Sequence, residues 1–262
     1  MANKNDHLLM RLRLIRHATL IVECLGHSIL VDPMLDDTAS RPPVQNSPNP
    51  LNNPLVALPV SAPDVLEDIE AVVVTHTHSD HWDATAVKLL PKNLPLFGQP
   101  EDESKFRSQA FIAMKPILGS ETWNDIDIRR TGGHHGSGEI GKAMAPVSGF
   151  VFRAKGEPTL YIAGDTIWCP EVEDVLRKFR PDVVVLNAGA AQFLEGGPIT
   201  MTADDVIAVC RNAPDAQVVA VHMEAINHCL LTRDDLGFQL EAARVSKQVA
   251  IPDDGAWLNF AA

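Results

Sequence analysis

The chain contains 262 residues, 45% of them apolar and 21% charged, which is enough to bury a large core and typical of a globular protein. Its formal net charge of −12 argues against a nucleic acid or an anionic membrane surface as the main partner. The first residues lack the apolar core of a signal peptide, and no apolar run approaches the ~20 residues of a membrane span. We therefore expect a cytoplasmic protein with a small-molecule substrate, and the composition leaves open whether it forms a homo-oligomer.

The four cysteines, Cys24, Cys169, Cys210 and Cys229, are scattered and form no CxxC pair. Thiolate zinc sites and redox pairs usually show that spacing. We therefore expect reduced thiols, as in other cytosolic proteins.

The chain begins with three short segments that favour β-strands, Leu8–Leu14, Thr19–Glu23 and Ser28–Val31. Asp32-Pro33 ends the third strand, because proline restricts the residue before it and cannot donate to a strand ladder. His17 lies between the first two strands, near a turn, where a histidine is either structural or part of a site.

Residues 34–63 form a long excursion that contains seven prolines. Such a composition prevents a regular helix or a central strand. Loops of this length are usually functional lids or mobile connections. The excursion is therefore predicted to be a lid or rim over a site, with a plain surface insertion as the alternative.

The next strand leads into the most informative motif of the sequence. Ala71–Val74 is apolar and partly β-branched, which predicts a short buried strand. On an extended backbone His76 and His78 project to the same face, so two imidazoles can bind one ion. Asp80 and His81 follow in a turn that can direct a carboxylate and a third imidazole toward a second ion. Imidazole and carboxylate ligands suit zinc, manganese or iron, so the motif predicts a metal site.

After this motif the sequence alternates between helices and strands. Helices are predicted at Ala84–Leu90, Glu101–Gln109, Glu171–Phe179, after Thr202 as an N-cap, and at Arg233–Arg244. Strands are predicted at Leu94–Gly98, Ile126–Arg130, Gly149–Ala154, Thr159–Ala163, Val183–Leu186, Gln217–Val221, Gln248–Ile251 and Ala256–Leu258. Residues 110–125 show no clear pattern. The alternation predicts sheets covered by helices, with binding residues where strands end.

Further candidate ligands follow three of these strands. The stretch Thr131–Gly141 contains five glycines, which permit a close approach to an ion or ligand, and two adjacent histidines, His134 and His135. It lacks the GK[ST] ending of a nucleotide-binding loop. Asp165 and His222 stand at the ends of two later strands, where each could be a ligand or a turn-forming residue.

The order of these residues resembles the metallo-β-lactamase superfamily. The resemblance covers almost the whole chain and rests on His76-x-His78-x-Asp80-His81 followed by His135, Asp165 and His222. Four stretches also resemble the branch that contains L-ascorbate-6-phosphate lactonase and N-acyl-phosphatidylethanolamine phospholipase D: Arg16-His17-Ala18-Thr19, Ile29-Leu30-Val31-Asp32-Pro33, Gly164-Asp165-Thr166 and Val221-His222. The resemblance implies an α+β fold, a four-layer αββα sandwich, in a single domain over residues 1–262.

The resemblance also implies a dinuclear site for two divalent ions, zinc first, with manganese or iron as alternatives. The implied ligands are His76, His78 and a histidine of the glycine-rich loop for the first ion, Asp80, His81 and His222 for the second, and Asp165 as a bridge. Position alone does not choose between His134 and His135. The resemblance favours His135, since in this branch the ligand often precedes a glycine, here Gly136, and His134 is then a candidate substrate contact.

Such a site implies a hydrolase. Two ions about 3.5–4 Å apart share a water and lower its pKa from about 15.7 towards 7, which supplies a bridging hydroxide. Asp80 would orient this nucleophile, and Asp165 would allow the two cations to lie close together. His228 and His17 are candidates for delivering a proton to the leaving group or for contacting the substrate. The expected reaction is cleavage of a lactone, ester or phosphoester.

Two other classes of function could use the same ligands. A di-iron redox protein is one alternative, although the chain has no CxxC pair to relay electrons. A non-catalytic metal-binding module is the other, although a complete ligand set exceeds what structure alone requires. The cysteine ligand of true β-lactamases has no counterpart, because Cys169 and Cys229 lie four and seven residues after Asp165 and His222. Both are predicted to be packing thiols, and antibiotic hydrolysis is not expected.

Overall fold

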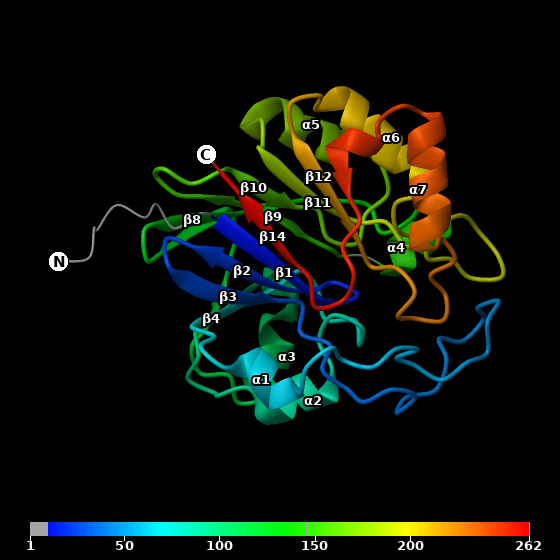
Figure 1. Ribbon diagram of the computed structural model, residues 1–262. Coiled ribbons are helices and arrows are strands. Elements are labelled where there is room, and N and C mark those ends of the chain that lie inside the picture. Colours follow the sequence, from blue (N-terminus) through cyan, green and yellow to red (C-terminus); the bar gives the residue numbers. More distant parts are fainter. Residues whose placement is uncertain (1–9, 145, 262) are drawn as a thin grey trace.

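The computed structural model describes residues 10–144 and 146–261 of the chain. Two seven-stranded sheets pack face to face, and helices cover the outer face of each (Figure 1). The α+β fold predicted from the sequence, a four-layer αββα sandwich, is confirmed. The first two residues of the strand predicted at Leu8–Leu14 lie outside the described residues.

The first sheet is antiparallel at one side and parallel at the other. Strands β14, β1, β2 and β3 pair antiparallel in that order, whereas β3, β4, β5 and β6 pair parallel. The strands are β1 (Met10–Arg16), β2 (Thr19–Cys24), β3 (His27–Val31), β4 (Ala71–Val74), β5 (Leu96–Gly98), β6 (Met114–Pro116) and β14 (Trp257–Phe260).

The second sheet repeats this division. Strands β7, β8, β9 and β10 pair antiparallel, whereas β10, β11, β12 and β13 pair parallel. The strands are β7 (Ser120–Trp123), β8 (Ile126–Thr131), β9 (Gly149–Arg153), β10 (Leu160–Ile162), β11 (Val183–Asn187), β12 (Gln217–Val221) and β13 (Val249–Ala250).

Helices form the two outer layers. One layer, at the bottom of Figure 1, contains α1 (Ala62–Leu66), α2 (Ala84–Leu89) and α3 (Glu103–Ser108). The other layer, at the top, contains α5 (Pro170–Phe179), α6 (Ala203–Asn212) and α7 (Arg233–Ala242). The short helix α4 (Gly138–Met144) lies apart from both layers and buries no side chain. Thr202 caps α6 through a reciprocal bond with Asp205, which confirms the predicted N-cap.

Alternation along the strands explains the layers. In β4, Ala71 and Val73 join the core between the sheets, whereas Val72 and Val74 join the core beneath the first helical layer. Successive side chains of a strand point to opposite faces, so a strand buried on both faces is apolar throughout. A third core lies between the second sheet and α5, α6 and α7.

The strand directions bring the polar strand ends to one edge of the sandwich. The parallel strands β3–β6 share one direction, and β1 shares it because one antiparallel strand separates β1 from β3. By the same reasoning β8 points the same way as β10, β11 and β12. Ligands in such sheets bind beyond the carboxyl ends of the strands. The residues that follow these strands are therefore candidates for one common site.

Several sequence-based boundaries differ from the structure. The glycine-rich stretch was expected to be a loop, but its second half forms α4, which is exposed and starts with Gly138 at a φ of +59°. The region 110–125 forms β6 and β7. The strand predicted at Gln248–Ile251 was wrong in its first part, because Ser246–Gln248 is a 3₁₀ turn. The helix predicted at Glu101–Gln109 begins as a 3₁₀ turn at Pro100–Asp102.

The proline-rich excursion, residues 34–63, contains no strand, and its only regular helix begins at Ala62. A single β-bridge between Arg41 and Asn53 closes it into a loop. Asn227, which lies between β12 and α7, accepts hydrogen bonds from Val44 N and Asn53 Nδ2 and donates its own N–H to Asn53 Oδ1. The excursion is therefore attached to the edge of the second sheet.

Within residues 10–144 and 146–261, none of the helices combines the length and the apolar character that a membrane crossing requires.

Candidate metal centre

Three histidines form a first cluster at the common edge. His76 and His78 follow β4, and His135 follows β8; their candidate ligand atoms lie within 4.8 Å of one another. His76 Nε2 and His78 Nδ1 are 2.9 Å apart. His76 and His135 are nearly inaccessible to solvent, whereas His78 is partly exposed.

Hydrogen bonds on the outer side of two rings fix their orientation. Thr75 Oγ1 donates to Asp32 Oδ2 at 2.7 Å, so it accepts from His76 Nδ1 at 3.1 Å. His135 Nδ1 donates to the carbonyl of Ile199 at 2.8 Å. In both rings the proton is therefore on Nδ1, and the lone pair of Nε2 faces the cluster, as expected of a metal-binding histidine.

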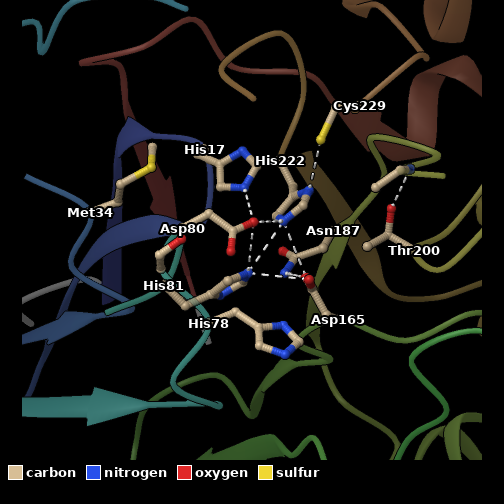
Figure 2. A network of polar contacts seen from close by, with 12 residues as sticks. His17, Met34, His78, Asp80, His81, Asp165, Asn187, Thr200, His222 and Cys229 are labelled. Atoms are coloured by element: carbon tan, nitrogen blue, oxygen red, sulfur yellow. Dashed lines mark hydrogen bonds and ion pairs between the residues drawn. The ribbon is translucent and has the colours of Figure 1, made fainter. Parts of the chain in front are cut away.

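A second cluster lies beside the first and contains His17, Asp80, His81 and His222 (Figure 2). Their candidate ligand atoms also lie within 4.8 Å of one another. His81 Nε2 and His222 Nε2 are each 3.9 Å from Asp80 Oδ2, and His17 Nε2 is 3.2 Å from it. Segments far apart in the sequence thus supply one cluster, which explains why the early motif cannot form the site alone.

Asp165 lies between the two clusters (Figure 2). Its Oδ2 is 3.4 Å from His135 Nε2 and 3.2 Å from His81 Nε2, and its Oδ1 is 3.2 Å from His222 Nε2. Asn187, at the end of β11, donates from Nδ2 to Asp165 Oδ1 at 2.6 Å and holds the carboxylate in this position. One carboxylate therefore faces both groups of histidines.

Asp32 was not identified from the sequence as a site residue, although it belongs to the quoted motif Ile29–Pro33 and directly follows β3. It is buried and accepts from Thr75 N, Thr75 Oγ1 and His81 Nδ1 at 2.7, 2.7 and 2.8 Å. These contacts fix the turn after β4 and direct His81 Nε2 inward. The sequence signal that could have identified Asp32 is its position as a carboxylate at the end of a strand. Its hydrogen-bond partners Thr75 and His81 lie 43 and 49 residues away in the sequence, so the sequence alone does not show that they meet.

The charges of the site favour a cation. Burial works to raise the pKa of Asp165, but His222, His81 and His135 outweigh it and hold the pKa well below its usual value. Burial works to lower the pKa of His81, but Asp165, Asp32 and Asp80 outweigh it and raise the pKa well above its usual value. In the metal-free protein a proton on His81 thus compensates for the carboxylates, a role that a bound metal ion would replace.

The donor set fits divalent metal ions. It consists of imidazole nitrogens and carboxylate oxygens, most of them on buried residues, and these are the ligands typical of zinc, manganese and iron. Among the described residues, no lysine or arginine pairs with Asp80 or Asp165. Asp165 is buried and Asp80 is partly exposed, and histidines are their charged partners, so further positive charge would stabilise the two carboxylates. Metal ions at the two clusters would supply it.

His17 was predicted to contact the substrate, but it is fully buried and stacks against His222 with 3.5 Å between ring centroids. Its Nδ1 has no hydrogen-bond partner among the described residues. An unpaired lone pair is less costly than an unpaired N–H, so the proton belongs on Nε2, where it is donated to Asp80. Burial lowers the pKa of His17 well below its usual value, so the ring is neutral.

His228 is buried, and its Nδ1 also lacks a partner among the described residues. Burial lowers its pKa to about 4. The ring of Phe193 lies 6.2 Å from the His228 ring, centroid to centroid. His228 is therefore a neutral imidazole at pH 7.

His134 lies away from both clusters. It is half exposed, and its Nε2 is 3.2 Å from Glu171 Oε1 at the start of α5. The two neighbouring histidines of the glycine-rich loop thus face different surroundings, because His135 is buried against Asp165.

A cavity of about 270 Å³ opens beside Asp80. Its wall is formed mainly by the proline-rich excursion and is largely apolar, with Arg41, Pro42, Pro43, Val44, Asn53, Ser79, Asp80 and Ile226 as lining residues. Arg41 is held by Asp36 and by the carbonyl of Ser79. A larger cavity of about 510 Å³ lies against α4 and contains none of the residues of the two clusters.

The chain is similar in sequence to a family of hydrolases. Residues 27–223 match the family described as the beta-lactamase superfamily domain. The chain is 35% identical to the UPF0173 protein YddR of Bacillus subtilis, with 96% of this chain and all of YddR covered. Further relatives, including one from Azorhizobium caulinodans at 25% identity over 94% of this chain and 98% of that protein, are named UPF0173 metal-dependent hydrolases.

Two solved structures are similar over almost the whole chain. An isothiocyanate hydrolase from Delia radicum gut bacteria is 38% identical, with a TM-score of 0.92 and coverage of 97% of this chain and 100% of that one. A possible metal-dependent hydrolase from Veillonella parvula is 35% identical, with a TM-score of 0.93 and coverage of 96% and 100%. The superfamily predicted from the histidine motif is confirmed. The chain belongs to the metallo-β-lactamase superfamily and, within it, to the UPF0173 family of metal-dependent hydrolases.

Proposed function

We propose that the chain is a dinuclear hydrolase of a small, largely apolar molecule. The observation that supports the dinuclear site is the position of Asp165, whose Oδ2 lies near His135 and whose Oδ1 lies near His222. The proposed ligands are His76, His78 and His135 for one ion, Asp80, His81 and His222 for the other, and Asp165 for both. Zinc is the first expectation, with manganese or iron as alternatives.

Two bound ions would lower the pKa of a shared water towards 7, giving a bridging hydroxide, and would polarise the bond under attack. The side chains of this chain position those groups. Asn187 holds Asp165, and Asp32 holds His81. His17 donates to Asp80 and so keeps its carboxylate turned toward His81 and His222.

The proposed role of His228 follows from its charge state. A group with a pKa of about 4 is not a cationic acid at pH 7. His228 can instead accept a proton at its unpaired ring nitrogen or hydrogen-bond the substrate there. Proton transfer to the leaving group would then use the proton released by the attacking water.

The cavity beside Asp80 supports a small neutral substrate. Prolines, Val44 and Ile226 form most of its apolar wall, and Asp36 balances the charge of Arg41, whose Nη1 donates to the carbonyl of Ser79. Arg41 Nη2 has no hydrogen-bond partner among the described residues and could donate to a substrate atom. An isothiocyanate fits this description and is the substrate class named for the 38% identical relative. Water would add to its central carbon, and cleavage of the carbon–nitrogen bond would give an amine and carbonyl sulfide. A lactone, ester or phosphoester is the second candidate, favoured by the motifs shared with the lactonase branch.

An activity screen tests the proposal. Metal-reconstituted protein is assayed with an aryl-alkyl isothiocyanate, a γ-lactone, an aryl ester and an aryl phosphodiester, beside the variants His76→Ala and Asp165→Asn. We expect turnover of the isothiocyanate that requires metal and falls by about 10³-fold or more in both variants, as for loss of a metal-activated nucleophile. Turnover that survives in either variant, or that persists after complete metal removal, would contradict the dinuclear mechanism. Turnover of the oxygen esters alone would move the assignment to the second candidate.

A further inference from the structure

A third group of potential metal ligands lies outside the two clusters. His134, Cys169 and Glu171 bring a ring nitrogen, a thiol sulfur and a carboxylate oxygen within 4.8 Å of one another. His134 comes from the loop after β8, and the other two from the start of α5. None of the three belongs to the hydrolytic site proposed above.

The backbone holds this group in place. His134 N donates to Thr166 Oγ1 at 2.9 Å, and Ile167 N donates to the carbonyl of His134 at 2.8 Å. Gly133 permits this close approach, because a Cβ at that position would lie 2.9 Å from Thr166 Cβ. The two loops that carry the three side chains are therefore fixed to each other before any ligand binds.

The spacing suits a single ion. His134 Nε2 and Glu171 Oε1 are hydrogen-bonded at 3.2 Å, a separation also close to the one of about 3.3 Å between two ligands on a tetrahedral zinc ion. Glu171 Oε2 is shielded from solvent and has no hydrogen-bond partner among the described residues. Cys169 is almost fully buried beneath the two polar groups, and its Sγ is 3.6 Å from Thr166 Oγ1. The side chains of His134 and Glu171 are each about half exposed, so they can rotate by the small amount needed to bind one ion.

A reactive-cysteine site is the competing interpretation of the same three residues. A nucleophilic thiol needs a lowered pKa and access to substrate. Burial raises the pKa of the Cys169 thiol, and the adjacent Glu171 carboxylate raises it further. A metal ion can deprotonate such a thiol by direct coordination, with release of the proton to solvent. The surroundings of Cys169 thus disfavour nucleophilic catalysis.

We propose that His134, Cys169 and Glu171 form an additional metal site that binds Zn²⁺ with one thiolate, one imidazole and one carboxylate ligand. Three protein ligands would leave a fourth position open to water, as in catalytic zinc sites. The site adjoins the hydrolytic centre in sequence, because His134 precedes His135 and Thr166 follows Asp165. The two centres differ in one measurable property, since the proposed ligands of the hydrolytic centre include no thiolate.

Cobalt substitution tests the proposal. Full-length protein is freed of metal and titrated with Co²⁺, which gives an intense near-ultraviolet charge-transfer band when bound to thiolate. We expect this band in the wild-type protein and its loss in Cys169→Ser. In His134→Asn and Glu171→Gln the Co²⁺ affinity of the band should fall by more than the 10- to 100-fold that is typical of losing an outer-shell partner, since both remove a direct ligand. Cys229→Ser is the matched control, because Cys229 Sγ lies 3.6 Å from His222 Nδ1 in the hydrolytic centre. It should keep the band.

Zinc content provides the second readout. The wild-type protein should bind one more zinc ion per chain than Cys169→Ser, whatever the occupancy of the hydrolytic centre. His134→Asn and Glu171→Gln change exposed side chains, so they test the site even if Cys169→Ser fails to fold. The proposal is overturned if the original protein lacks the thiolate band, if the band persists in Cys169→Ser, or if zinc content is equal in the two proteins.

Discussion

At the scale of single residues, the candidate ligands depend on partners that bind no ion themselves. Asp32 is the clearest case, because it orients His81 and the backbone after β4 with three hydrogen bonds. Asn187 holds Asp165, and Thr75 holds His76. Such partners usually change metal affinity by one to two orders of magnitude.

Replacing Asp32 with asparagine should therefore weaken metal binding. The asparagine side chain would have the same shape but only one accepting oxygen for three donors, so we expect a 10- to 100-fold loss of zinc affinity in competition with a chelator. Asp182→Asn is the control, because Asp182 caps Thr159 N at the other end of the second sheet. Unchanged zinc affinity in Asp32→Asn, with the fold intact by circular dichroism, would exclude this role.

His228 makes a prediction about acid stability. Its folded pKa of about 4 is below the unfolded value of 6.5, so the unfolded chain binds more protons between these values. Stability from this residue is therefore complete above pH 6.5 and declines as the pH falls toward 4. Between pH 6.5 and 5.5, metal-free His228→Gln should lose about 1 kcal/mol less unfolding free energy than the original protein. Urea denaturation at the two pH values measures this; equal losses would mean that His228 is not buried as a neutral ring.

At the scale of elements, the proline-rich excursion forms much of the wall of the cavity beside Asp80. The sequence predicted a lid or rim, and residues 41–44 line the cavity beside Asp80. The attachment to Asn227, 183 residues beyond Val44, was not predictable, because no local pattern specifies so distant a partner. In the glycine-rich loop the local pattern was itself misleading. Its five glycines suggested irregular structure, but the last two lie in α4.

Releasing the excursion should affect substrate binding more than chemistry. Asn227→Ala removes the acceptor for Val44 N and Asn53 Nδ2, and each unpaired buried group costs about 1–3 kcal/mol. We expect faster proteolytic cleavage within residues 34–63 and a higher KM, with a smaller change in kcat. Asn52→Ala, on the exposed part of the same loop, is the control. A variant with the original proteolysis pattern and KM would show that the attachment does not govern access.

At the scale of the whole molecule, the sequence predicted the layers well because both sheets bury apolar strands and helices cover them. The histidine motif after β4 identified the chemistry, since three imidazoles and a carboxylate within six residues suit metal ions. The order of strands in the two sheets could not be predicted from the sequence. It is this order that brings His76, Asp165 and His222 to one edge. The sequence could not show which of His134 and His135 faces the cluster, because neighbouring residues in a loop point to different surroundings. The structure places His135 against Asp165 and His134 against Glu171.

One edge of the sandwich is proposed to bind two metal ions through seven side chains. Anomalous diffraction at the zinc edge, from crystals of zinc-loaded Cys169→Ser, tests it most directly, because this variant lacks the additional thiolate site. We expect two peaks, one between His76, His78 and His135 and one between Asp80, His81 and His222, with Asp165 in contact with both. A single peak in an enzyme that is fully active, or peaks away from these residues, would contradict the account.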